Sequence, residues 1–251
     1  MGLFGGYWSG TGSVFCEKIT CFPVRAVVVI MPPMKNLTVV IQAGGESKRM
    51  GTPKALVSFC GMPLICRGLK RLGPVADELI VTSNDLKSLD FLCGKVKYGE
   101  KLKIYPDVLD GRGALSGLYT ALYHASCPYV GIVACDMIFP SAPLLLAERD
   151  ALEASGADVA VPVTSHGYEP FHAVYRRSTC LAAVKEALEL GQTRANSWFE
   201  KVEVCEFTHE MVLAADQRGG AFVNVNTPEE LIAMERRVLN GEMTKISDAD
   251  E

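Results

Sequence analysis

From Leu37 onward, short apolar runs alternate with longer segments in which apolar residues recur at helical spacing. The short runs are rich in β-branched residues and are apolar on both sides, as strands buried inside a sheet are. The longer segments have the one-sided pattern of helices that cover a sheet. The alternation therefore predicts an α/β fold, with a largely parallel sheet between two layers of helices.

The predicted elements follow one another with no internal repeat, low-complexity block or linker between them. The predicted strands lie at residues 37–42, 78–82, 102–105, 129–134, 158–163, 171–175, 201–207 and 222–225. The predicted helices lie at residues 64–72, 115–125, 142–155, 177–190, 195–199 and 228–239.

The composition narrows the class of protein. Of the 251 residues, 49 % are apolar and 22 % are charged, which excludes a collagen, a coiled coil and a wholly disordered chain. This length is within the range of a single α/β domain. The net charge of -4 and the isoelectric point of about 5.7 argue against nucleic acid or a membrane surface as a partner. An anionic ligand would have to be held by a local group of cations.

The two ends of the chain differ from the region between them. Residues 1–33 are rich in glycine at their start, carry few charges and show no sustained period. We interpret them as a flexible or spurious extension and Met34 as the natural start, followed by one domain over residues 34–240. Residues 241–251 are rich in acidic side chains and are predicted to form a disordered tail.

The sequence predicts a cytoplasmic protein. The early apolar run at residues 26–31 is far shorter than the about 20 residues of a membrane span, and two prolines follow it where a signal peptide has small residues. The nine cysteines include no C-x-x-C pair. They are therefore predicted to be reduced thiols, neither disulfide partners nor zinc ligands.

The loop after the first predicted strand combines glycines with cations. Ligands of open α/β sheets bind beyond the carboxyl ends of the strands, so this loop is a candidate site. Residues 42–54 read Q-A-G-G-E-S-K-R-M-G-T-P-K, in which glycines expose backbone N–H groups and Lys48, Arg49 and Lys54 supply positive charge. This is a phosphate-binding loop in physical terms, although it matches neither the P-loop nor the dinucleotide-binding pattern. The alternative is an ordinary glycine-rich turn with solvated cations.

Polar residues also stand at the ends of three further predicted strands. Thr82 and Asp107 could hydrogen-bond a base or a ribose, or cap the turns that follow. Asp136 follows a wholly apolar strand, where a carboxylate is costly unless it is paired or bound to a cation. Mg²⁺ between Asp136 and substrate phosphates would meet this need, because Mg²⁺ typically uses one or two carboxylates plus phosphate oxygens. The alternative is an aspartate that caps the next helix.

The second half of the chain adds two asparagines and a histidine. Alternation places Asn224 and Asn226 on one side of the last predicted strand, where they could hold a phosphate, a metal-bound water or a pterin, or cap the following helix. His172 lies inside a predicted strand, and a single histidine there is more often structural than catalytic.

Several of these motifs together resemble one family. The string A-G-G-x-S-x-R-M-G-x-x-K at residues 43–54 resembles the nucleotide-binding signature of the molybdenum cofactor guanylyltransferase family, in which most members have Leu at the position of Gln42. Cys135-Asp136-Met137 is similar to the metal motif of that family, and F-V-N-V-N-T-P-E-E-L at residues 222–231 is similar to its asparagine motif. The resemblance implies a three-layer, Rossmann-like nucleotidyltransferase fold with a mostly parallel, mixed sheet.

The resemblance also implies an activity and a set of residues. It implies an enzyme that transfers GMP from GTP to Mo-molybdopterin with release of pyrophosphate, and recipient molybdoenzymes or their chaperones as further partners. Catalysis would fall to Lys54, Arg49 and Asp136, with Mg²⁺ on Asp136. The implied nucleotide-binding residues are Gln42, Ala43, Gly44, Gly45, Lys54, Thr82, Asp107 and Asp136. The implied acceptor-binding residues are Arg194, Asn224 and Asn226.

Other functions remain open on the sequence alone. They are a cytidylyltransferase for the same cofactor, a sugar-phosphate nucleotidyltransferase, and a non-catalytic GTP-binding module that delivers the cofactor. The cytidylyl branch usually reads A-A-G where this chain has Ala43-Gly44-Gly45, and the extra glycine leaves room for a purine. A pure binding module could lose the metal carboxylate, whereas this chain has both Lys54 and Asp136.

Overall fold

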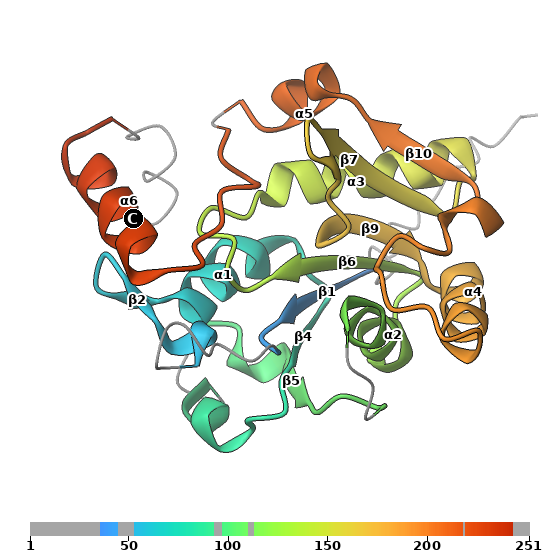
Figure 1. The fold of residues 1–251 in the computed structure, drawn as a ribbon, viewed down its shortest axis with the longest axis horizontal. Coiled ribbons are helices and arrows are strands. Elements are labelled where there is room, and N and C mark those ends of the chain that lie inside the picture. The colour runs from blue at the N-terminus through green and yellow to red at the C-terminus, as the bar shows by residue number, and fades with distance from the viewer. Residues whose placement is uncertain (1–35, 45–52, 93–96, 110–112, 218, 243–251) are drawn as a thin grey trace, which may run out of the picture. The chain divides into compact units, whose positions relative to one another are not determined.

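The computed structural model describes residues 36–44, 53–92, 97–109, 113–217 and 219–242, all within one compact unit, Lys35–Glu251. Its main sheet has eight strands in the order β10-β7-β9-β6-β1-β4-β5, with β8 paired to β7 (Figure 1). The strands of this sheet are β1 (Leu37–Gln42), β4 (Glu78–Thr82), β5 (Leu102–Tyr105), β6 (Tyr129–Ala134), β7 (Val159–Thr164), β8 (Gly167–Tyr168), β9 (His172–Arg176) and β10 (Val204–Phe207). A hairpin of two short strands, β2 (Ser58–Phe59) and β3 (Met62–Pro63), stands apart from it.

Six α-helices alternate with these strands along the described part of the chain. They are α1 (Leu64–Leu72), α2 (Ala114–His124), α3 (Ala142–Ser155), α4 (Arg177–Glu189), α5 (His209–Ala215) and α6 (Pro228–Leu239).

The sheet is mostly parallel. Strand β1 pairs in parallel with β4 and β6, β4 pairs in parallel with β5, and β7 pairs in parallel with β10. Strand β9 is antiparallel to both of its neighbours, β6 and β7. The predicted α/β class with a mostly parallel, mixed sheet is therefore confirmed.

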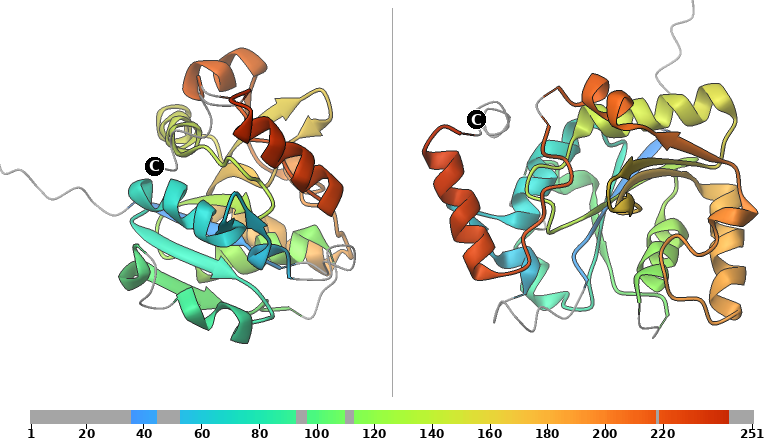
Figure 2. Two further views of the ribbon diagram at one scale, coloured as in Figure 1. Left: turned by 90° about the vertical axis from the view of Figure 1, so that its left-hand side faces the viewer. Right: turned by 45° about the horizontal axis from the view of Figure 1, so that its top comes forward.

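Helices cover both faces of the sheet, and the side chains of β1 show why. Val39 and Ile41 belong to the core under α1, α3 and α5, whereas Val40 belongs to the core under α2 and α4. All three side chains are at most 1 % exposed. In Figures 1 and 2, α2 and α4 lie on one side of the sheet, and α3 and α5 lie on the other. Burial on both faces explains the absence of polar alternation in the sequence of this strand.

The order of the strands fixes where a ligand can bind. From β1 the chain moves to β4 and β5 on one side, then returns to β6 on the other side of β1 and continues toward β9 and β7. The carboxyl ends of β1 and β6 therefore lie next to each other at the point where the strand order reverses. Open α/β sheets bind ligands at such a point.

A third, smaller apolar cluster holds the C-terminal helix. It contains Phe59 of β2, Phe139 after β6 and Val225, and the half-buried Leu231 and Met234 of α6 pack against it. Figure 1 shows α6 beside the β2–β3 hairpin at the edge of the molecule. The cluster thus joins the segment that follows β6 to the segment that precedes α6.

The predicted bounds are confirmed for β1, β4, β5, β6, α1, α3 and α6, and α2, α4, β7 and β9 differ from the prediction by one residue at one or both ends. The predicted strand at residues 222–225 is wrong, because this segment makes a single isolated bridge, between Met137 and Asn224. The predicted helix at residues 195–199 is also wrong: the chain makes a turn there, followed by a short 3₁₀ helix at Phe199–Lys201. In that turn the indole N–H of Trp198 donates to the carbonyl of Ala195 at 2.7 Å, so a buried side chain, not a helical ladder, fixes the backbone.

Two smaller differences concern bounds and missed elements. Strand β10 begins at Val204, three residues later than predicted, and the strands β2, β3 and β8 and the helix α5 were not predicted. The expectations for residues 1–33 and for most of residues 241–251 lie outside the described residues and stay predictions.

Within the part of the chain that the structure describes, no helix is long and apolar enough to cross a membrane.

Candidate functional site

Three side chains from distant parts of the chain meet at the carboxyl ends of β1 and β6. The ammonium of Lys54 lies 2.5 Å from Oδ2 of Asp136 and donates a second hydrogen bond to Oδ1 of Asn226 at 2.8 Å. Lys54 begins a short 3₁₀ helix, Lys54–Leu56, in the segment that leads from the glycine-rich loop to α1. The predicted catalytic lysine, the predicted metal carboxylate and one predicted acceptor residue are therefore in direct contact.

The position of Asp136 follows from the strand before it. The backbone N–H of Cys135 donates to the carbonyl of Gln42 at 3.0 Å, which continues the pairing of β6 with β1 by one residue. Asp136 then leaves the sheet with its side chain 22 % exposed, beside a Lys54 side chain that is 19 % exposed. A carboxylate that is mostly shielded from water is costly without a cation, and the ammonium of Lys54 offsets that cost.

Asn226 is held by the start of α6. Its backbone N–H donates to Oε2 of Glu230 at 2.7 Å. The same glutamate forms a capping box with Thr227, whose hydroxyl accepts from the backbone N–H of Glu230. This arrangement satisfies N–H groups at the start of the helix and fixes the residue that precedes it. The capping box thus holds the backbone of Asn226 at the start of α6, from where its side-chain amide reaches Lys54.

The residues present fit Mg²⁺. Asp136 offers a hard carboxylate oxygen, and a single carboxylate is enough when substrate phosphates supply the other oxygens. The described residues contain no group of three His, Cys, Asp or Glu side chains that could hold a metal ion on their own. The donor set is thus that of a site shared with a phosphorylated ligand, not of a self-contained metal centre.

Cys135, next to Asp136, is not a nucleophile. Burial raises the pKa of its thiol to about 12, so it stays protonated at neutral pH. The described cysteines form no disulfide.

The glycine-rich loop is described only at its start. Ala43 donates its backbone N–H to the carbonyl of Thr82 at 2.8 Å, and Gly44 is exposed with open space where a Cβ would be. The predicted site residues Gly45 and Arg49, and the third cation, Lys48, lie outside the described residues.

Gln42 takes an unusual position for a polar side chain. Its amide lies against Gly117 of α2, where a Cβ would come within 3.3 Å of Nε2. Nε2 is buried and has no hydrogen-bond partner among the described residues. A larger residue at position 117 would displace this amide, so the glycine provides its space.

The two predicted nucleotide-binding residues at the carboxyl ends of β4 and β5 differ in exposure. Thr82 is 2 % exposed, so its side chain is buried beneath the site. Asp107 is half-buried and makes reciprocal hydrogen bonds with Asn84: its backbone N–H donates to Oδ1 of Asn84, and Nδ2 of Asn84 donates to its carboxylate, each at 2.9 Å. Asn84 belongs to the polar stretch after β4 that the sequence marks as suited to bind a base or a ribose, but only Thr82 of that stretch was predicted to contact the nucleotide.

The remaining predicted acceptor residues, Arg194 and Asn224, are exposed. Arg194 follows Thr193, whose carbonyl accepts from the backbone N–H of Leu115 at the start of α2. Asn224 makes its backbone bridge to Met137, one residue after Asp136. Asn224 therefore borders the Lys54–Asp136 pair through the backbone, while no described contact joins Arg194 to it.

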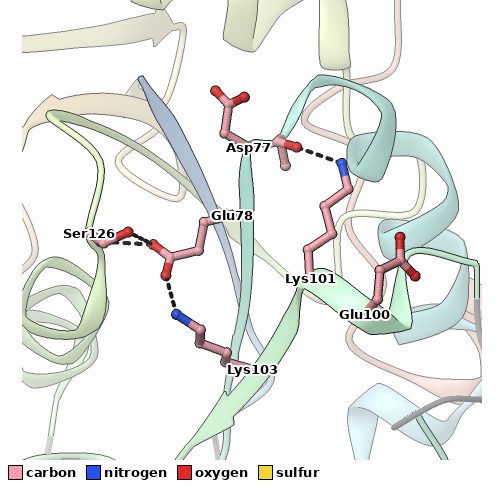
Figure 3. A pocket seen from close by; sticks show the side chains of 7 residues that line it. Asp77, Glu78, Glu100, Lys101, Lys103 and Ser126 are labelled. Carbon is pink, nitrogen blue, oxygen red and sulfur yellow. Dashed lines mark hydrogen bonds and ion pairs between the residues drawn. The ribbon is translucent and has the colours of Figure 1, made fainter. Parts of the chain in front are cut away.

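A pocket of about 570 Å³ lies at the opposite ends of the strands. Its walls include Glu78, the first residue of β4, with Lys101, Lys103 and Ser126 (Figure 3). Glu78 accepts hydrogen bonds from Lys103 and Ser126, and Lys101 donates to the carbonyl of Ala76. These polar groups bind one another, so the pocket is a structural network at the amino ends of the sheet and not part of the candidate site.

Comparisons with known proteins show the family of this chain. Residues 39–206 match the family model described as the MobA-like NTP transferase domain. A protein of Natranaerobius thermophilus named "Probable molybdenum cofactor guanylyltransferase" is 32 % identical over 78 % of this chain and 93 % of its own length. The molybdenum cofactor guanylyltransferase of Desulfosudis oleivorans is 31 % identical over 84 % of this chain and 100 % of its own. The chain belongs to the molybdenum cofactor guanylyltransferase family.

Solved structures support the same assignment of fold. The crystal structure of molybdopterin-guanine dinucleotide biosynthesis protein A from Archaeoglobus fulgidus superposes with a TM-score of 0.68 at 25 % identity, over 81 % of this chain and 99 % of that chain. The predicted family and the predicted nucleotidyltransferase fold are confirmed. A molybdenum cofactor guanylyltransferase is a nucleotidyltransferase, and members of this class typically need a divalent metal.

Proposed function

We propose that this chain transfers GMP from GTP to the terminal phosphate of Mo-molybdopterin, forming the guanine dinucleotide cofactor and pyrophosphate. The observation that carries the proposal is the contact of Lys54 with both Asp136 and Asn226 at the carboxyl ends of β1 and β6. It joins the glycine-rich loop, the acidic strand end and the asparagine motif in a chain whose relatives bear the name of this activity.

The reaction needs no strong base. The acceptor is a phosphate monoester, which is largely dianionic at pH 7 because its second pKa is about 6. One of its oxygens forms a bond to the α-phosphorus of GTP, and the bond from that phosphorus to the bridging oxygen of the β-phosphate breaks. His172 and Cys135 are buried and cannot take part. What the protein must supply is alignment of two anions and compensation of their charge.

We assign that task to the site residues predicted from the sequence, of which Gly45 and Arg49 lie outside the described residues. Lys54, with Arg49, would contact the phosphates of GTP and stabilise the charge that develops in the transition state. The backbone of Gln42, Ala43, Gly44 and Gly45, with Asp107, would hold the nucleoside. Thr82 would support this backbone from below, through its carbonyl, which accepts from the N–H of Ala43. The acceptor would bind near Arg194, Asn224 and Asn226.

Asp136 would hold Mg²⁺ together with the phosphates of GTP. Bound there, the metal would supply positive charge to the phosphate oxygens. Lys54 orients the carboxylate of Asp136 from one side, through the bond from its ammonium to Oδ2.

The product would pass to molybdoenzymes or to their chaperones, which are the further partners that we propose. We place the reaction in the cytoplasm, in line with the six free cysteines among the described residues.

The test is a nucleotide panel. The purified chain is incubated with Mg²⁺, Mo-molybdopterin and one of GTP, CTP, ATP or UTP, and the release of pyrophosphate is measured. We expect release with GTP and none with the variant Asp136→Asn, which keeps the volume of the side chain but removes its charge. Release with CTP alone would show a cytidylyltransferase. Tight GTP binding without any release would show a binding module.

A further inference from the structure

A fully buried histidine and a fully buried glutamate have no role in this chemistry. His172 of β9 and Glu148 of α3 are both 0 % exposed. Oε1 of Glu148 lies 3.8 Å from Nδ1 of His172, too far for a hydrogen bond, and neither atom has a hydrogen-bond partner among the described residues. Burying two polar groups that do not bond each other lowers the stability of the fold. The other contacts of the pair therefore need to be considered.

The second ring nitrogen of His172 has a partner. Nε2 accepts a hydrogen bond from the backbone N–H of Ser141 at 3.0 Å. An imidazole nitrogen can accept only when it carries no proton, so the proton of His172 must be on Nδ1 and the ring must be neutral. Burial lowers the pKa of His172 to about 4, in agreement with a neutral ring. A neutral ring forms no ion pair with Glu148, and burial raises the pKa of the Glu148 carboxyl well above its usual range.

Ser141 is the far end of the segment that carries Asp136. It caps α3, where its hydroxyl accepts from the backbone N–H of Leu144 at 3.4 Å. At the near end of the same segment, the N–H of Cys135 is bound to the carbonyl of Gln42. Asp136 therefore lies between two anchors, of which one is a bond to the sheet and the other is the bond to His172.

His172 also touches the segment that leads to Asn226. Its ring meets the ring of Phe222 edge to face, with centroids 5.7 Å apart and planes at 85°. Two backbone hydrogen bonds join this segment to the first: Ile138 donates to the carbonyl of Val223 at 3.0 Å, and Val225 donates to the carbonyl of Asp136 at 3.3 Å. One imidazole thus contacts the base of both segments that meet at Lys54.

We propose that His172 is a positioning residue of the transferase site, which acts on Asp136 through Ser141 and on Asn226 through Phe222. This inference rests on the proposed function for its kinetic consequence. It does not make His172 a catalytic residue, because the side chain is fully buried and reaches no substrate.

The experiment compares replacements that differ in where they present an acceptor. Gln places its amide oxygen near the position of Nε2, Asn reaches only the position of Nδ1, and Leu fills volume without an acceptor. The variants His172→Gln, His172→Asn and His172→Leu are measured for kcat, for KM of GTP and for thermal stability. Val184→Ala is the matched control, because Val184 is 0 % exposed in α4 on the other face of the sheet.

A positioning role predicts that His172→Leu and His172→Asn lower kcat by about 10- to 100-fold, the scale of a small misplacement of reacting groups. The KM of GTP should change little, and His172→Gln should recover most of kcat. Val184→Ala should lose thermal stability but keep kcat. If His172→Leu does not fold, the comparison of Gln with Asn makes the same test.

A second measurement does not depend on the substrate. Hydrogen exchange read by mass spectrometry, well below the unfolding temperature, should rise at residues 136–141 and 222–226 in His172→Leu and His172→Asn, and stay low in His172→Gln and Val184→Ala. Unchanged exchange in all variants, or the same rise in Val184→Ala, would overturn the proposal. If the wild-type chain transfers no nucleotide, the proposed function fails, and the exchange pattern still decides whether His172 positions these segments.

Discussion

Lys54 is the residue through which the candidate site is held together. Its ammonium contacts a carboxylate 82 positions away and an amide 172 positions away along the chain. The side chains of Lys54 and Asp136 are about one fifth exposed, so water screens their attraction less than that of a surface ion pair. The same ammonium is placed to face phosphate oxygens that approach Asp136.

Replacement of this lysine gives a prediction at the scale of one side chain. Lys54→Ala should lower transition-state stabilisation by about 2–4 kcal/mol, the range for one preorganised electrostatic donor. The measurement is kcat/KM for pyrophosphate release from GTP. Lys185→Ala is the matched control, because Lys185 is an exposed lysine of α4, and it should leave kcat/KM unchanged. Equal rates for the two variants would remove Lys54 from the catalytic residues.

The sequence predicted Lys54, Asp136 and Asn226 as separate candidates but not their direct contact. Strand ends and the family resemblance point to each residue by itself, whereas the contact depends on how η1 (Lys54–Leu56) and the start of α6 pack. Asn84 was missed for a related reason. An asparagine after a strand has the pattern of a turn cap, and its reciprocal bonds with Asp107 exist only when β4 and β5 are side by side.

Among the elements, those of the central sheet were predictable because each has a pattern of its own. Strands β1, β4 and β6 are largely apolar and are buried on both faces, and α6 begins with a capping box. The segment at residues 222–225 was not predictable in the same way. Its apolar and polar residues alternate as in a strand, but its backbone pairs with a neighbour at one position only, between Asn224 and Met137.

The start of α6 provides a prediction at the scale of an element. Thr227→Ala removes the hydroxyl that accepts from the backbone N–H of Glu230 at 3.2 Å. Loss of such a cap costs about 0.5–2 kcal/mol. Urea unfolding should show this loss for Thr227→Ala and almost none for Thr227→Ser, which keeps the hydroxyl. A loss of equal size in both variants would show that the methyl group of Thr227, not its cap, is what stabilises α6.

At the scale of the whole molecule, the two ends of the strands have different tasks. The carboxyl ends carry the candidate site, while at the amino ends Glu78 joins β1, β4, β5 and the turn before β6 through Thr38, Lys103 and Ser126 (Figure 3). Burial alone would raise the pKa of the Glu78 carboxyl, but hydrogen bonds from Lys103, Thr38 and Ser126 lower it to about 2 from its ordinary value of 4.5. The folded protein therefore favours the charged form of this carboxyl.

This shift predicts how stability depends on pH. A carboxyl whose pKa is lower in the folded state stabilises the fold fully above the ordinary value of 4.5, and the stabilisation is lost as pH falls toward about 2. The shift corresponds to about 3 kcal/mol. Glu78→Gln should lower the free energy of unfolding at pH 7 and flatten its fall between pH 5 and pH 2. The control Glu186→Gln, at an exposed carboxyl of α4, should leave both the free energy and its pH dependence almost unchanged.

The shallow packing of α6 determines which unfolding event a loss of activity in denaturant would measure. None of the residues of α6 is fully buried, yet the segment that it fixes supplies Asn226. A helix attached in this way can detach at a lower free energy than the sheet needs to unfold. With rising denaturant, the site would then come apart while β1, β4 and β6 were still paired. Activity would measure the local stability of the C-terminal helix, and spectroscopic unfolding would measure that of the sheet.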